Sequence, residues 1–103
     1  MARDRICVIG SEEMVLGFRL LGIPGDVPAG PEDVRRILRE RFAEPGMALI
    51  LIEDRVAAQA PDLVAELQGA KEFPLVVKIP GPDGPMAEES IRDFIVGAIG
   101  VRL

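Results

Sequence analysis

Hydrophobic residues in this chain form two kinds of pattern, which alternate from one end to the other. Short runs that are mostly apolar read as strands, and they cover residues 5–9, 47–52 and 74–79. Between and after them, apolar residues recur every three or four positions, as on one face of a helix, over residues 12–21, 31–43, 55–68 and 86–99. The chain is therefore expected to alternate strands with helices, with glycine- and proline-rich turns between them.

The central run, Met47–Ile52, is apolar at every position, and a strand of this kind is buried on both faces. Such strands belong to parallel sheets covered by helices on both sides. The segment Ile23–Ala29 carries Pro24 and Pro28, so any strand there must be short and lie at a sheet edge. Right-handed strand–helix–strand units then predict a three-layer α/β/α domain with about four parallel strands in the order 2-1-3-4, plus a C-terminal helix.

Helix ends carry their usual signals. Ser11 is placed to cap the first helix and Gly22 to end it, while Pro31 suits the first position of the second. The third helix, about Arg55–Gln68, contains Pro61, where a kink or a restart is expected. The second helix carries one core-facing stripe, made of Val34, Ile37, Leu38 and Phe42.

The last part of the chain divides into a linker and a helix. We expect a body over residues 1–80, a Pro/Gly linker over 81–85 and an amphipathic helix over 86–103. This helix either packs on the sheet like the others or reaches a partner and lays its apolar stripe along another helix. The candidate partner-binding residues are Ile91, Phe94, Ile95, Ala98, Ile99 and Val101.

Composition limits the partners that the chain can have. A length of 103 residues suits one domain, and a net charge of −5 argues against nucleic acid as a partner. The longest apolar run is far below the roughly 20 residues of a membrane span, and the N-terminus does not read as a signal peptide. We therefore expect a cytoplasmic location without membrane insertion. The single cysteine, Cys7, is expected to be a small buried residue.

The chain contains few residues or motifs that could catalyse a reaction or bind a metal or cofactor. The chain has no histidine, so Ser11 has no base to activate it and a zinc site lacks ligands. The first turn lacks the G-x-G-x-x-G pattern, and Glu12 and Glu13 occupy the helix N-terminus that a phosphate would need. We expect no catalytic residue, no metal and no cofactor.

Two weaker alternatives stay open. Acidic residues near the strand ends could converge on Mg²⁺ in a receiver-like signalling domain; these are Glu12, Glu13, Glu53 and Asp54, together with Lys78. The arginines of the second helix could form either a solvated face or a docking surface for an acidic partner; these are Arg35, Arg36, Arg39 and Arg41.

Four segments in register resemble the F subunit of the A-type/V-type rotary ATPases, in its archaeal and bacterial branch. These segments are Ile6–Gly10 with Val15–Gly22, Leu49–Asp54, Phe73–Pro80 and Ile91–Gly100. The resemblance implies a non-catalytic subunit of the central rotor stalk, peripheral to a membrane-bound complex that transports H⁺ or Na⁺. It implies binding to the coiled coil of the D subunit. It also implies a C-terminal helix that contacts D, reaches the A/B catalytic ring transiently and influences coupling or ATP hydrolysis. ATP itself would be bound by the A and B subunits.

Overall fold

The computed structural model describes residues 3–70, 72–82 and 84. These residues make up the body of the protein. The predicted C-terminal helix over 86–103 lies outside the described residues, as does part of the predicted linker.

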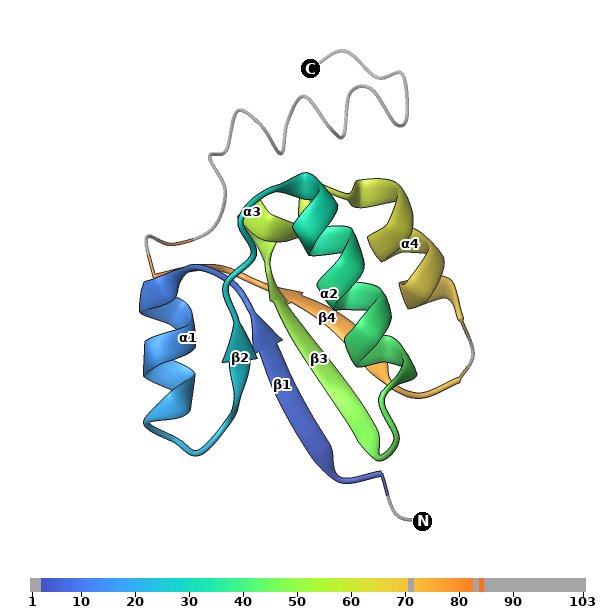
Figure 1. The fold of residues 1–103 in the computed structure, drawn as a ribbon, viewed down its shortest axis with the longest axis horizontal. Coiled ribbons are helices and arrows are strands. Elements are labelled where there is room, and N and C mark those ends of the chain that lie inside the picture. Colours follow the sequence, from blue (N-terminus) through green and yellow to red (C-terminus); the bar gives the residue numbers. More distant parts are fainter. Residues whose placement is uncertain (1–2, 71, 83, 85–103) are drawn as a thin grey trace, which may run out of the picture.

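The body is one four-stranded parallel sheet with helices between its strands (Figure 1). Its elements are β1 (Arg5–Ile9), α1 (Glu12–Arg19), β2 (Gly25–Asp26), α2 (Pro31–Ala43), β3 (Met47–Glu53), α3 (Asp54–Ala57), α4 (Pro61–Gly69) and β4 (Leu75–Ile79). The strand order is β2-β1-β3-β4, so both the predicted fold class and the predicted order are confirmed.

The edge strand β2 is only two residues long, as its flanking prolines predicted. It pairs with β1 through Val8 opposite Gly25 and Ile9 opposite Asp26. A side chain at position 25 would collide with β1, because a Cβ there would lie 2.6 Å from Cγ1 of Val8. Glycine at this position therefore lets the edge strand approach its neighbour.

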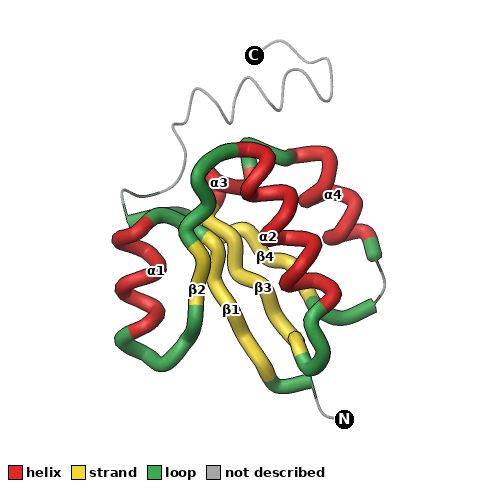
Figure 2. The backbone as a smooth tube through the Cα atoms, viewed as in Figure 1, coloured by secondary structure: helices red, strands yellow, loops and turns green. Residues whose placement is uncertain are grey.

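Helices cover the two faces of the sheet unequally (Figure 2). One face packs against α2, α3 and α4 in a large core that includes Cys7, Ile9, Val34, Ile37, Leu38, Ile50, Ile52, Leu63, Val64 and Val76. In the described part of the chain, the other face packs only against α1, in a small core of Val8, Met14 and Val15 with Phe18, Ile23, Leu51 and Ile79 at its border. In β3, Ile50 and Ile52 are fully buried in the large core, whereas Leu49 and Leu51 on the other face are partly buried, so both faces of Met47–Ile52 carry apolar side chains for a structural reason.

Both ends of α1 follow the predicted signals. The Ser11 hydroxyl accepts a hydrogen bond from the backbone N–H of Met14 at 3.4 Å, as an N-cap does. At the other end Gly22 has φ +83°, and the N–H groups of Gly22 and Ile23 donate to the carbonyls of Arg19 and Phe18. This pair of bonds is the Schellman motif, which the left-handed glycine makes possible.

Pro61 divides the third predicted helix completely. Two helices take its place, α3 ending at Ala57 and α4 beginning at Pro61, so the proline restarts the helix instead of kinking it. Proline has no N–H to donate inside a helix but is well suited to the first position of a new one. Both short helices contribute to the large core, through residues that include Val56, Leu63 and Leu67.

Candidate functional site

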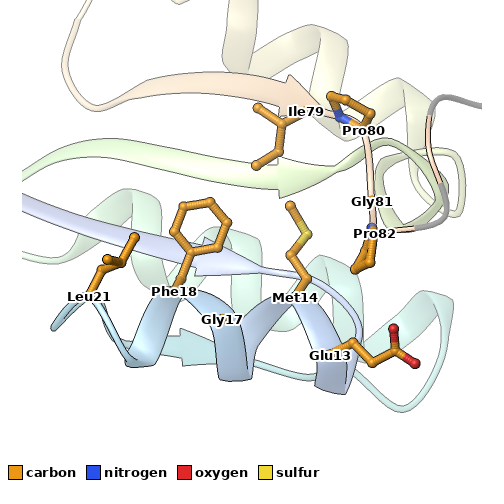
Figure 3. Close-up of a pocket in the computed structure, with 9 residues that line it drawn as sticks. All are labelled: Glu13, Met14, Gly17, Phe18, Leu21, Ile79, Pro80, Gly81 and Pro82. Atoms are coloured by element: carbon orange, nitrogen blue, oxygen red, sulfur yellow. The ribbon is translucent and has the colours of Figure 1, made fainter.

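An apolar groove runs between α1 and the carboxyl end of β4 (Figure 3). It encloses about 320 Å³. Its lining residues are Glu13, Met14, Gly17, Phe18 and Leu21 from the α1 side and Ile79, Pro80, Gly81 and Pro82 from the end of β4 and the turn after it. Figure 3 shows Phe18 and Met14 pointing from α1 toward Ile79 across this space.

Helical spacing explains why the α1 residues share this side. Phe18 comes four positions after Met14, and Leu21 comes three positions after Phe18. Glu13 and Gly17 are also four positions apart. Residues at these spacings lie along one side of the helix and its end. Gly17 stands in the middle of this row and is exposed. Apart from its chain neighbours and the backbone of its own helix, a Cβ built on Gly17 would meet no heavy atom of the described residues within 4 Å, so the groove is open at this point.

The sheet face beside the groove is apolar and partly uncovered. In the register of the sheet, Ile6, Leu49 and Leu75 form one row across three strands, and Val8, Leu51 and Val77 form the next. Exposure rises toward β4 along the second row, in which Val8 is fully buried and Val77 is 40% exposed, whereas both ends of the first row are exposed, Ile6 at 37% and Leu75 at 55%. On this face α1 therefore shields Val8 of β1 and reaches Ile79 of β4, and the side chains of Leu75 and Val77 are left uncovered by the described helices.

Behind the groove, at the carboxyl ends of the strands, lies the buried side chain of Glu53. Its Oε2 atom accepts hydrogen bonds from the Ser11 hydroxyl at 2.9 Å and from the Ser11 backbone N–H at 3.1 Å. Glycines on two sides leave room for this carboxylate: a Cβ at Gly10 would lie 3.2 Å from Oε2, and one at Gly81 would lie 2.8 Å from Cδ. Glu53 thereby links the ends of β1, β3 and β4.

The acidic residues considered for Mg²⁺ are only partly brought together. Glu12, Glu13 and Glu53 border one shallow depression, but Arg55 lines it as well. Within the described residues, no group of three or more His, Cys, Asp or Glu side chains is arranged to hold a metal ion. Asp54 accepts a hydrogen bond from the N–H of Arg55, and Lys78 lies inside β4, as its sequence position predicted.

The arginines of α2 form a face rich in ion pairs. Arg35 pairs with Asp62, and Arg36 pairs with both Asp33 and Glu40 at exposed positions. These contacts raise the pKa of both guanidinium groups and lower the pKa of Asp62. The pKa of Asp33 is lowered chiefly by a hydrogen bond from the Ala29 N–H, and next by Arg36. Acidic partners from the same chain therefore already lie against Arg35 and Arg36, as the solvated-face interpretation predicts.

Cys7 is buried in the large core, as predicted. Burial raises the pKa of its thiol to about 11, because the thiolate would lose its hydration in that position.

The groove was not predicted from sequence. Its two walls come from segments about sixty residues apart, and only the strand order brings them together. Two signals could have indicated it: a glycine within the apolar part of the first helix, and the alternation of Leu75, Val77 and Ile79 along one face of the last strand. The predicted partner-binding residues lie outside the described residues.

Comparison with known proteins gives the family. Residues 6–95 match the model of the family described as ATP synthase (F/14-kDa) subunit. The chain belongs to this family. Among its relatives, the F subunit of the A-type ATP synthase of Methanothermobacter thermautotrophicus is 28% identical over 103 residues, which cover 97% of this chain and 96% of that protein.

Two further archaeal relatives cover nearly the whole chain as well. The F subunit of the A-type ATP synthase of Thermoplasma volcanium is 33% identical over 96 residues, 93% of this chain and 91% of that protein. The one from Thermococcus sibiricus is 32% identical over 107 aligned positions, 96% of this chain and 97% of that protein. The resemblance found in the sequence is thus confirmed.

As a member of this ATP synthase family, the chain is an accessory subunit of a multi-subunit rotary ATPase. Within the described residues, none of the helices combines the length and the apolar character that crossing a bilayer requires.

Proposed function

We propose that this chain is a non-catalytic rotor subunit of the central stalk, which binds the coiled-coil D subunit and helps couple or regulate ATP turnover with ion transport. Family membership supports the first part of this proposal, that the chain is a subunit of an A-type rotary ATPase. The resemblance supports the partner, because the F subunit of such complexes pairs with D. The catalytic ring of A and B subunits would be a transient second contact.

One observation in the body carries this proposal: large hydrophobic side chains are exposed on α1 and on the sheet face that α1 covers only in part. Leu16, Leu20 and Leu21 are 58%, 81% and 76% exposed on and just after α1. On the sheet face shared with α1, Ile6 and Leu75 are 37% and 55% exposed. Exposed apolar surface that is not covered within the chain is typical of a protein–protein interface.

The C-terminal stripe supplies the second part of the interface. On the basis of their helical spacing, the residues proposed to contact D are Ile91, Phe94, Ile95, Ala98, Ile99 and Val101. A helix laid along a coiled coil uses residues three and four positions apart, which is the spacing found here.

The proposal is tested by co-purification with the D subunit. The full chain should form a complex with D that survives gel filtration, and deletion of residues 88–103 should weaken it while the body remains folded. Phe94→Ala truncates the centre of the stripe and should also weaken the complex, whereas Val96→Ala, on the opposite side of the predicted helix, should not.

Three results would contradict this proposal. Absence of a complex between the full chain and D would reject the partner. Unchanged affinity after the deletion would remove the C-terminal segment from the interface. A large loss of stability of the isolated Phe94→Ala chain, without loss of affinity for D, would show that the stripe packs within the chain instead.

A further inference from the structure

We propose that the side chain of Gln68 protects the outer edge of β4 from pairing with a second copy of this chain. β4 is the last strand in the order β2-β1-β3-β4, so one of its two edges faces away from the sheet. Gln68 lies at the end of α4, and its Nε2 atom donates a hydrogen bond to the carbonyl of Val76 in β4 at 3.1 Å. This inference concerns the isolated chain and does not depend on the proposed function.

A hydrogen bond of β1 shows which neighbour the backbone groups of each residue face. Val8 has its side chain in the small core beside α1, and its N–H donates toward β2, to the carbonyl of Pro24 at 3.0 Å. Side chains and backbone groups both alternate along a strand, and all four strands are parallel. A residue with its side chain on the α1 face therefore directs its backbone groups toward the β2 end of the sheet. A residue on the other face directs them toward the β4 end.

This rule places the backbone groups of Val76 and Lys78 on the outer edge of β4. Val76 belongs to the large core on the face opposite α1, and Lys78 follows two positions later, so the N–H and C=O groups of both point away from β3. The hydrogen bond from Gln68 to the Val76 carbonyl agrees with this placement. Pro74 and Pro80 occupy the next positions of the same row, just outside the strand, and neither has an N–H group. Pairing at this edge would therefore depend on Val76 and Lys78.

These two residues would suit a second copy of the same strand, because an unpaired edge is a template for strand addition. In an antiparallel pair centred on Val77, the N–H and C=O groups of Val76 would bond those of Lys78 of the second copy, and the reverse bonds would form as well. Leu75 would then lie opposite Ile79 of the second copy on the α1 face. Since Leu75 and Val77 are 55% and 40% exposed, the joined sheets would cover part of this apolar surface.

Gln68 interferes with this pairing at one atom. The Val76 carbonyl is the acceptor that the Lys78 N–H of a second copy would need, and the Gln68 amide already binds it. The second copy would have to displace this side chain before it could pair.

Lys78 adds a second obstacle to pairing. Its side chain is exposed, and in the symmetric pair the two Lys78 side chains would lie diagonally across the junction on one face. Like charges at this distance repel each other, and lysine on an edge strand is a common protection against strand addition.

Self-association of the full chain tests the proposal. Gln68→Met keeps the length of the side chain but cannot donate a hydrogen bond, so it should lower the dissociation constant of a dimer at least tenfold, measured by analytical ultracentrifugation. Gln59→Met is the matched control, because Gln59 is the other glutamine of the chain, is exposed, and precedes α4 at the opposite end from Gln68. Adding Lys78→Thr to Gln68→Met removes both obstacles and should strengthen association further.

Amide hydrogen exchange locates the contact. In the wild-type monomer, the N–H groups of Val76 and Lys78 should exchange faster than that of Val77, which faces β3. In the associated Gln68→Met chain, the N–H groups of Val76 and Lys78 should become protected as the protein concentration rises. Association that leaves them unprotected would place the contact elsewhere and would overturn the proposal.

Two further results would overturn it. If Gln68→Met associates no more strongly than the wild-type chain, the glutamine does not protect the edge. If Gln59→Met associates as strongly as Gln68→Met, the added apolar side chain is responsible and not the lost hydrogen bond. Failure of the wild-type chain to bind D would reject the proposed function alone, because none of these measurements involves D.

Discussion

Arg41 on α2 binds Asp26 on β2 through two parallel hydrogen bonds, from Nε to Oδ2 at 2.7 Å and from Nη2 to Oδ1 at 3.0 Å. Both side chains are about three-quarters buried. The hydrogen bonds to Asp26 are the main reason that the pKa of Arg41 is raised above its usual value. Because β2 is only two residues long, this pair is a substantial addition to the few backbone hydrogen bonds that join the edge strand to β1.

Replacing Arg41 with lysine should therefore destabilise the body although the charge is kept. Lysine cannot reproduce the two parallel bonds of a guanidinium group, so we expect a loss of about 1–2 kcal/mol in the free energy of unfolding, measured in urea. Arg36→Lys on the same helix is the control, because its ion pairs are exposed and should contribute under about 1 kcal/mol. Equal losses in the two variants would contradict this role for Arg41.

Ser11 has two tasks, the cap of α1 and the contact with Glu53, and substitutions can separate them. Ser11→Ala removes both and should cost about 1–3 kcal/mol in urea unfolding. Ser11→Gly keeps most of the N-cap preference, so its loss reports mainly the hydrogen bond to Glu53. If Ser11→Gly is as stable as wild type, the hydroxyl contact with Glu53 contributes nothing measurable.

Gly81→Ala should disturb the same cluster from the opposite side. Its Cβ would lie 2.8 Å from Cδ of Glu53, so the carboxylate must shift from the position in which it accepts hydrogen bonds from Ser11. We expect a loss of about 1–3 kcal/mol, measured by thermal unfolding. Gly69→Ala, at the last residue of α4, is the control, since a Cβ there would meet no described atom within 4 Å apart from its chain neighbours and its own helix backbone.

Combining the two substitutions gives a stricter check. If Gly81→Ala acts by displacing Glu53 from Ser11, its cost should shrink in the Ser11→Ala background, where that bond is already gone. Simple addition of the two losses would show that the alanine acts elsewhere.

The Cys7 thiol should resist alkylation in the folded chain. Its pKa is raised to about 11 by burial, so at pH 8 almost no thiolate is present, and we expect iodoacetamide to react much more slowly than in urea. Because the folded chain holds this proton more tightly than the unfolded chain, the resulting stability is constant below about pH 8.5 and falls as the pH rises toward 11. A Cys7→Ala chain should lose less stability over this range; an identical pH dependence would contradict the assignment.

The sequence predicted the sheet well because its strongest signals are local. Met47–Ile52 is apolar at every position, which has few explanations other than a strand covered on both faces. Pro24 and Pro28 restricted the second strand to a short edge, and Pro61 marked the restart between α3 and α4. In each case the signal lies within a few neighbouring residues, so it does not depend on contacts with distant segments.

The groove could not be predicted in the same way, because it depends on contacts between distant segments. Gly17 and Ile79 become neighbours across it only after four strands have taken the order β2-β1-β3-β4. The role of Glu53 was missed for a similar reason: an acidic residue after a strand reads as a solvated charge, and its burial depends on glycines at positions 10 and 81. The stripe over residues 91–99 remains a prediction from spacing alone.

The position of Glu53 has one more consequence. Parallel sheets of this type usually receive small ligands in the crevice at the carboxyl ends of their strands. Here the protein fills part of that crevice with its own carboxylate, fixed by Ser11 and enclosed by Gly10 and Gly81. A small ligand in the remaining space would meet the bound carboxylate of Glu53 and the side chains of Glu12 and Glu13, so the edge at which such folds commonly hold phosphates is unfavourable here for an anion.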